Sequence, residues 1–352
     1  MKMKTLYAFG LLTAAVLLTG CKNGDNEFPD YEGGVSVYFA NQTPVRTLVM
    51  GEDKYDTTLD NAHKCQIQAT QGGSYGSRAV TLSIVVDNTL CNNLYFDQSY
   101  TQPVLPMPSD YYTLSSNTMT YTGFRGAVEV QLTDKFFQDP KALEVNYVIP
   151  VVITGQVGAD RILSGTPWDE FAAAPIRTNP VHWKVAPQDY TLYCVKYICK
   201  YDAKYLRYGE DRITKGGTTT TVTRAKTAEP KDMEVKSDIK TLALNKIIYP
   251  VTIDVDANPD VADMRTCELE ITFGNDDQVV SIASRTAGVT ATGSGSYKYK
   301  SEKKAWGDKD RDGLYLDYTI DFGGGVSVTT KDILIWQQRG IVKEEFTTYY
   351  KN

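Results

Sequence analysis

Apolar side chains recur at every second position through much of this sequence, and this alternation limits the possible folds more than any other feature. The clearest runs are Val80, Leu82, Ile84 and Val86 in the first half, and Ile247, Tyr249, Val251, Ile253 and Val255 in the second. Successive side chains of a β-strand point to opposite faces of a sheet, so this period places one face on a core. The sequence therefore predicts an all-β protein.

The chain is long enough for two domains. It has 352 residues, whereas a single hydrophobic core rarely grows beyond about 250 to 300 residues. Two prolines flank a short strand-like run near the middle of the chain, and we place the domain junction there, at residues 180–188. The first domain is then residues 34–179, and the second is residues 189–352.

The two domains are expected to have different sheet arrangements. In residues 34–179, short strands between turn-rich stretches such as residues 71–74 and 121–126 are typical of an immunoglobulin-like β-sandwich. In residues 189–352, few connections are long enough for helical crossovers, which favours an antiparallel meander. A closed, lipocalin-like β-barrel is our first interpretation of this domain, because closure removes exposed sheet edges, and a second sandwich is the alternative.

The N-terminus has the pattern of an export signal. Lys2 and Lys4 precede an apolar run of about 13 residues, shorter than the roughly 20 that a membrane-spanning helix needs. The run ends in Leu18-Thr-Gly-Cys21, which resembles the bacterial lipobox. Residues 1–20 are therefore expected to be a lipoprotein signal peptide, with Cys21 as the lipid-attachment residue. The acidic segment at residues 21–33 is expected to be a solvated tether, and it resembles the signal that exports Bacteroidetes lipoproteins to the cell surface.

These features predict a protein anchored by lipid to the outer membrane and exposed at the cell surface. The composition argues against one class of partner, because 37 Lys and Arg residues against 43 Asp and Glu residues give a net charge of −6. A nucleic-acid-binding protein needs a basic face, so we expect no nucleic acid among its partners.

Five cysteines follow the expected lipidation site: Cys65, Cys91, Cys194, Cys199 and Cys267. Their number is odd and none has CxxC spacing, which argues against a disulfide framework and a structural zinc site. We expect them to be buried small apolar residues, and a Cys65–Cys91 disulfide stays open as an alternative in an envelope compartment. His63 and His182 are the only histidines, and structural roles are expected for both.

The run Asp308-Lys-Asp310-Arg-Asp312-Gly313 is the strongest local signal for a metal. Carboxylates on alternate residues can converge on a hard cation such as Ca²⁺, while the glycine permits a turn. The twelfth loop position is Thr319 instead of the Glu of an EF-hand. Two interpretations stay open: a calcium loop of another class, with calcium as the one expected cofactor, and a solvated hairpin turn whose acids are neutralised by Lys309 and Arg311.

Aromatic residues lie near the same loop. Sugar-binding sites combine aromatic platforms with planar polar side chains, and both kinds of group occur around the acidic run. The candidate glycan-binding residues are Trp306, Tyr297, Tyr299 and Trp336. Tyrosine and tryptophan also fill β-cores, and Trp336 follows an apolar run that is typical of a buried strand.

The sequence contains no recognisable catalytic motif. We find no H-E-x-x-H pair, phosphate loop or dinucleotide fingerprint. We therefore expect a non-enzymatic protein without catalytic residues. A glycoside hydrolase is the minor alternative, because any two of the 43 acidic residues could converge in a cleft.

Two further segments complete a pattern with the lipobox and the acidic tether: Tyr121-Thr-Gly-Phe-Arg-Gly-Ala-Val-Glu-Val-Gln-Leu-Thr-Asp134 and Tyr147-Val-Ile-Pro-Val-Val-Ile153. Together they resemble an uncharacterised Bacteroidetes lipoprotein family, in which an N-terminal sandwich domain of unknown function precedes varied C-terminal modules. The resemblance implies surface lipoproteins that are often associated with glycan-uptake loci and sometimes described as adhesins. We therefore expect glycan binding for capture or uptake, and the alternative is an adhesive or structural envelope protein that docks a protein partner.

Overall fold

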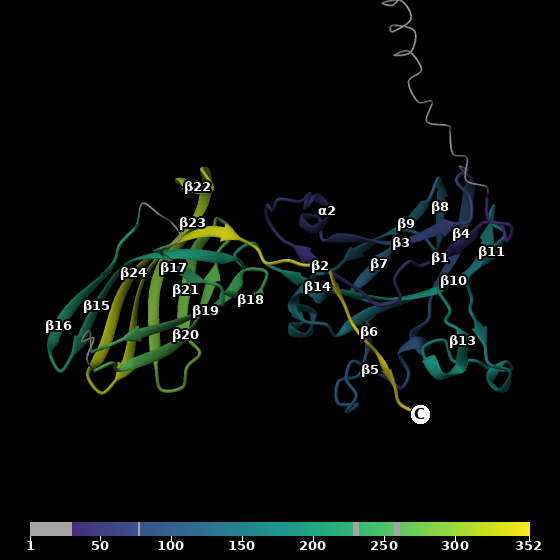
Figure 1. Ribbon diagram of the computed structural model, residues 1–352. Coiled ribbons are helices and arrows are strands. Elements are labelled where there is room, and N and C mark those ends of the chain that lie inside the picture. Colours follow the sequence, from purple (N-terminus) through teal and green to yellow (C-terminus); the bar gives the residue numbers. More distant parts are fainter. Residues whose placement is uncertain (1–29, 77, 228–231, 257–260) are drawn as a thin grey trace, which may run out of the picture.

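Two β-rich bodies lie side by side in the computed structural model (Figure 1). The structure describes residues 30–352 except residues 77, 228–231 and 257–260. The expected signal peptide, Cys21 and most of the expected tether therefore lie outside the described residues. The predicted all-β, two-domain fold is confirmed. In the described part of the chain, no helix is long and apolar enough to cross a membrane.

The first domain is a sandwich of two sheets. One sheet contains, in spatial order, β11 (Arg161–Ile162), β1 (Ser36–Tyr38), β3 (Lys64–Gly72), β9 (Arg125–Leu132) and β7 (Tyr112–Leu114). The other contains β25 (Glu344–Glu345), β2 (Pro44–Val49), β14 (Tyr190–Ile198), β10 (Tyr147–Val157), β4 (Ala79–Val86) and β8 (Thr118–Thr122), and β6 (Leu105–Pro106) pairs with β10. One apolar core draws residues from both sheets.

Short elements complete this domain. The helices are α2 (Thr58–Asn61) and α3 (Asp134–Gln138), and the 3₁₀ turns are η1 (Asn88–Cys91), η2 (Pro140–Leu143), η3 (Asp169–Phe171) and η4 (Pro180–His182). Two strand pairs lie outside the main sheets: β12 (Thr166–Pro167) with β13 (Trp183–Val185), and β5 (Leu94–Tyr95) with β26 (Tyr349–Tyr350).

Strand β10 shows how sequence sets position in the sandwich. Residues 147–153 are apolar at every position, and all of them are buried. Ile149 and Val151 join the core between the sheets, whereas Val148 and Val152 pack in a second cluster on the opposite face. A strand that buries both faces belongs in the centre of a sheet, and β10 lies between β14 and β4.

The boundary between the domains differs from the prediction. We expected the second domain to begin at residue 189, but β14 pairs with both β10 and β2 and is a central strand of the first domain. The expected junction at residues 180–188 instead includes β13, which pairs with β12. An alternating strand has the same pattern whichever sheet it joins, so the period alone did not identify its partners.

The C-terminal residues also return to the first domain. After β24 (Val326–Gln338) the chain crosses back, β25 pairs with β2, and β26 pairs with β5 (Figure 1). The chain thus passes between the domains twice, near residues 199–203 and 339–343. Arg339 ties the two domains together, because it donates to the Met50 carbonyl at 2.7 Å and to the Lys200 carbonyl at 2.8 Å.

The second domain is one antiparallel sheet that curls around its own core. In spatial order it contains β16 (Thr218–Arg224), β15 (Lys204–Lys215), β24, β23 (Lys309–Gly323), β22 (Thr290–Trp306), β21 (Gln278–Ser284), β20 (Met264–Phe273), β19 (Lys246–Asp254) and β18 (Lys240–Ala243), and β17 (Glu234–Lys236) pairs with β15. The sheet has the expected barrel-like curl. It is not closed, since the described residues of the edge strands β16 and β18 do not pair with each other.

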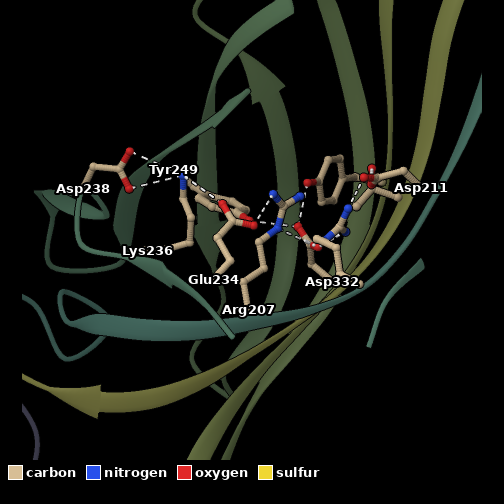
Figure 2. A network of polar contacts seen from close by, with 10 residues as sticks. Arg207, Asp211, Glu234, Lys236, Asp238, Tyr249 and Asp332 are labelled. Atoms are coloured by element: carbon tan, nitrogen blue, oxygen red, sulfur yellow. Dashed lines mark hydrogen bonds and ion pairs between the residues drawn. The ribbon is translucent and has the colours of Figure 1, made fainter. Parts of the chain in front are cut away.

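Charged side chains occupy part of the interior of this domain (Figure 2). Asp332 on β24 is at the centre, and its carboxylate accepts four hydrogen bonds, from Arg207 Nε at 2.9 Å, Arg224 Nη2 at 2.7 Å, the Tyr249 hydroxyl at 2.8 Å and the Tyr318 hydroxyl at 2.7 Å. Arg224 also pairs with Asp211, and Arg207 pairs with Glu234 of β17. These bonds fasten β16 and β17 to the rest of the sheet.

Candidate functional site

Two of the predicted glycan-binding residues bond to other parts of the protein. The Tyr297 side chain is buried, and its hydroxyl donates to Asp312 Oδ2 at 2.6 Å, so Tyr297 is a core residue and not an open platform. The Tyr299 side chain is 58% exposed, but its hydroxyl bonds to Glu52 Oε1 at 3.0 Å. The Lys300 ammonium lies 4.4 Å from the centre of the Tyr299 ring.

Trp306 and Trp336, the other two predicted residues, pack against different clusters. Trp306 packs against a small cluster that contains Leu206 and Ile335, whereas Trp336 packs against the core inside the curl. Trp336 and Arg311 line a hollow of about 220 Å³ between the β22–β23 hairpin and residues 52–54. The Arg311 guanidinium lies 5.4 Å from the centre of the Trp336 ring and covers one face of it, and the ring also packs against the core.

The carboxylates of the acidic run do not converge on one point in the structure. The carboxylate of Asp310 accepts from the Lys303 ammonium at 2.9 Å and the Lys304 backbone amide at 3.1 Å. The Asp308 side chain is 84% exposed, and the Asp312 carboxylate is engaged by Tyr297. Among the described residues, no group of three or more His, Cys, Asp or Glu side chains could hold a metal ion. This arrangement agrees with the hairpin interpretation, although Lys303 and Lys304 make the contacts that we expected from Lys309 and Arg311.

The five cysteines in the described residues are free and buried, as expected. The Cys65–Cys91 disulfide is absent because Cys65 lies in the core between the sheets, whereas Cys91 lies in the cluster on the far face of the second sheet. Burial raises the pKa of each of these two thiols to about 12, which makes them poor nucleophiles. The rings of His63 and His182 pack against aromatic rings, in agreement with structural roles.

A larger hollow lies at the end of the first domain that faces away from the second domain. Strand β14 runs toward the second domain and β10 is antiparallel to it, so Val157, at the end of β10, marks the far end. The β8–β9 turn and the start of β4 lie at this same end (Figure 1, right). The hollow measures about 660 Å³, and we call it the tip pocket; its lining residues are Tyr31, Gln71, Gly72, Gly73, Ser74, Tyr75 and Phe124.

The aromatic rings of the tip pocket are open to solvent. The side chains of Tyr31, Tyr75 and Phe124 are 60%, 71% and 51% exposed. Backbone hydrogen bonds hold the segments together, from the Tyr31 amide to the Gly73 carbonyl at 2.8 Å and from the Gln71 amide to the Phe124 carbonyl at 3.1 Å. Open aromatic faces of this kind stack against the apolar face of a sugar ring.

Gly73 is needed for this arrangement. Its φ of +98° lies in the region that favours glycine, and a Cβ atom there would approach the Gly34 carbonyl oxygen to 2.3 Å. The close crossing of these two backbones brings the segment of Tyr31 beside the end of β3. The Arg161 guanidinium lies 5.4 Å from the centre of the Tyr31 ring and supports it from one side.

Gln71 lines the tip pocket with its amide buried below the surface. Its side chain is only 5% exposed, and neither Oε1 nor Nε2 has a hydrogen-bond partner within the described part of the chain. An unpaired buried polar group costs about 1 to 3 kcal/mol, which a ligand that pairs with it would offset. A sugar hydroxyl both donates and accepts hydrogen bonds, as this amide requires. None of the described lining residues is charged, so the pocket favours a neutral ligand.

The sequence identifies residues 71–74 and 121–126 as turns but does not show that they meet. One signal was available: Tyr75 and Phe124 lie beside turn glycines, where no alternating pattern requires an apolar side chain. Gln71 carries no such signal, since its burial follows from the parity of β3 and the missing partner is visible only in three dimensions.

These observations define the class of the protein: a β-sandwich domain followed by a curled β-sheet domain, with an aromatic pocket at the free end of the sandwich. Residues 200–340 match a family described as a domain of unknown function, DUF5627, and residues 29–160 match an N-terminal domain family. The first of these matches begins directly after β14, in agreement with the domain boundary in the structure. No curated protein matches the chain.

The chain is 36% identical to a Bacteroides ovatus protein of unknown function whose crystal structure is known. The match covers 92% of this chain and 100% of that one, with a TM-score of 0.82. The chain therefore belongs to the family of that protein. A second Bacteroides ovatus structure, of a protein proposed to bind carbohydrate, is 14% identical over 71% of this chain and 67% of that one; its TM-score of 0.27 is too low to carry an argument.

Proposed function

We propose that this protein binds neutral glycans at the tip pocket and acts as a non-enzymatic capture protein at the cell surface. The observation that carries this proposal is the buried amide of Gln71, which has no partner among the described residues, beside three exposed aromatic rings. A saccharide presents a hydroxyl to such an amide and an apolar face to such rings. An apolar protein patch would leave the amide unpaired, so it fits the pocket less well.

The proposed anchor is compatible with this site. Nine residues, 22–30, separate Cys21 from Tyr31, and nine extended residues span at most about 30 Å. A lipid on Cys21 would therefore keep the tip pocket close to the outer membrane, with the second domain directed away from the first residues of the sandwich.

The test is a glycan array of neutral plant, host and microbial saccharides, probed with the chain from Lys22 to Asn352. Two variants address the pocket. Tyr75→Ala removes an exposed ring, and Gln71→Leu removes the amide at similar volume. We expect each variant to lose binding by about tenfold or more. The Gln71→Leu variant should melt at the same or a higher temperature, because it removes a buried polar group that has no partner.

Two of the glycan-binding residues predicted from the sequence serve as control variants. Tyr299→Ala removes a ring of similar exposure in the second domain, and Trp306→Ala removes the first predicted tryptophan; both should keep binding. Loss of binding in Trp306→Ala or Trp336→Ala, with Tyr75→Ala unaffected, would move the site to the β22–β23 hairpin. No binding to any neutral saccharide would contradict the proposal.

One observation favours the alternative, docking of a protein partner. Strand β16 is an edge strand, and the side chains of residues 218–223 are exposed along its length. An open edge can pair with a strand from another protein. Replacing Thr221 with proline would block such pairing while leaving the tip pocket intact, so the two functions are separable by one variant each.

A further inference from the structure

A hollow lies between the two domains, and nothing in the proposed function uses it. It measures about 730 Å³, within the usual range of small-molecule sites. We call it the interdomain cleft. Thr47 and Lys196 line it from the first domain. Lys204, Lys240 and Leu242 line it from the second, and Asp202 and Ile341 line it from the two crossing segments.

Some of the charged side chains in the interdomain cleft already have hydrogen-bond partners. Lys196 Nζ lies 2.7 Å from Glu344 Oε2. Asp202 Oδ2 accepts from the backbone amide and the hydroxyl of Thr241, both at 2.8 Å. These groups hold the walls of the cleft together and leave little capacity for a ligand.

Three cations in the cleft have no carboxylate partner. The side chains of Lys204 and Lys240 make no hydrogen bond or ion pair within the described residues. Arg339 binds only backbone carbonyls, and its buried Nε has no partner in that part of the chain. Two acids of the lining have no cationic partner among the described residues: Glu144, which is exposed, and Asp202, which bonds only to neutral groups of Thr241.

The charge of the cleft that has no opposite partner is therefore positive, three cations against two acids, in a protein whose net charge is −6. Cationic charge gathered in a concave site with low-dielectric walls attracts anions more strongly than the same charge spread over a surface. The walls include aliphatic side chains, among them Leu143, Leu242 and Ile341. They add apolar contact area for the body of a ligand.

We infer that the interdomain cleft binds a small carboxylate-bearing ligand, with Lys204 and Lys240 as the residues that contact the carboxylates. Uronic-acid saccharides and acidic peptides both supply this chemistry. Because the ligand would touch both domains and both crossing segments, its binding would also fix the domains relative to each other. This inference is independent of the tip pocket, which has no charged residue in its described lining.

Calorimetric titration of the chain from Lys22 to Asn352 tests the inference. The probes are digalacturonate, its neutral counterpart digalactose, and the dipeptide Glu-Glu, at low ionic strength. We expect at least one acidic probe to bind and digalactose not to bind. The double variant Lys204→Met and Lys240→Met should weaken the acidic probe by about tenfold or more, as expected for the loss of charge-assisted hydrogen bonds.

Lys184→Met is the matched control, because Lys184 is an exposed lysine on β13, outside the lining of the cleft. It should leave the affinity unchanged. Binding of digalacturonate alone would assign the carboxylate to a sugar acid, and binding of Glu-Glu alone would assign it to a peptide. The inference is overturned if neither acidic probe binds, if digalactose binds as well as digalacturonate, or if the double variant binds like the unmodified chain.

Binding at the interdomain cleft and binding at the tip pocket can be tested separately. Tyr75→Ala should leave the binding of acidic probes unchanged, and the double lysine variant should leave the binding of neutral glycans unchanged. Melting temperatures of all variants show whether a loss of binding reflects loss of the fold.

Discussion

Asp332 shows, at the scale of one residue, how the second domain accommodates charge in its interior. Burial alone would raise the pKa of this carboxyl, but Arg207 and Arg224, with the Tyr318 hydroxyl, hold it below its usual range. The carboxylate is therefore ionised and fully hydrogen-bonded (Figure 2). Such an arrangement is most sensitive to removal of one partner, since the remaining charges stay buried.

We predict that Asp332→Asn destabilises the protein by about 3 to 5 kcal/mol, because it leaves the Arg207 and Arg224 guanidinium groups without their shared counter-charge. Urea denaturation followed by tyrosine fluorescence measures the change. Asp317→Asn is the control: Asp317 lies on neighbouring β23 and forms an exposed pair with Lys331 at 3.9 Å, and exposed pairs contribute little. Equal effects of the two substitutions would contradict a special role for Asp332.

The lowered pKa of Asp332 predicts that the stability of the protein depends on pH. A carboxyl whose pKa is lower in the folded state stabilises the protein above its unfolded-state pKa, about 3.9. That contribution disappears as pH falls through the folded-state pKa, which lies lower still. The stability difference between the unmodified chain and Asp332→Asn should therefore be constant near neutral pH and shrink below about pH 4. A difference that stays the same into strong acid would argue against the lowered pKa.

At the scale of elements, Gly209 lets β15 pass close to β24. Its φ is +148°, and a Cβ atom there would meet the Lys331 carbonyl oxygen at 1.9 Å, which no side chain tolerates. Gly209 lies between Arg207 and Asp211, so this close approach also positions the two β15 residues of the polar network.

We expect Gly209→Ala to destabilise the protein by about 3 kcal/mol, from backbone strain together with the clash against β24. The control is Gly216→Ala in the β15–β16 turn, where φ is +58° and nothing lies within 4 Å of the added atom. That substitution should cost only about 1 to 2 kcal/mol of backbone strain. Thermal unfolding of the two variants shows which substitution destabilises the protein more. A smaller loss of stability for Gly209→Ala than for Gly216→Ala would show that β15 can shift away from β24.

At the scale of the whole molecule, the chain is predicted to be held to the membrane at one end by lipid. Cys21→Ala should release the protein from the membrane fraction, because only the thiol of Cys21 can carry the acyl chain in the expected lipobox. Fractionation and immunoblotting measure the distribution. Cys91→Ala is the matched control, since Cys91 is buried in the first domain, and it should leave the protein with the membranes. Membrane retention of Cys21→Ala would exclude the lipid anchor.

The domain arrangement also belongs to this scale, and the sequence predicted it only in part. Strand β14 has the same alternation as the strands of the second domain, yet its Val195 and Tyr197 complete the core of the first. The C-terminal segment returns to pair with β2 and β5. Each domain boundary is therefore set by which strands pair, and not by where the chain changes composition.

The sequence by itself determined the all-β class, the number of domains and the antiparallel meander of the second domain, because side-chain alternation and turn residues are local patterns. Only the tertiary structure decided that Tyr31, Gln71 and Phe124 share a pocket, that Tyr297 is in the core, and that the two lysines of the interdomain cleft lack partners. The physical reason is that a site depends on contacts between residues far apart in the chain, and strand register, which brings them together, leaves no trace in any single segment.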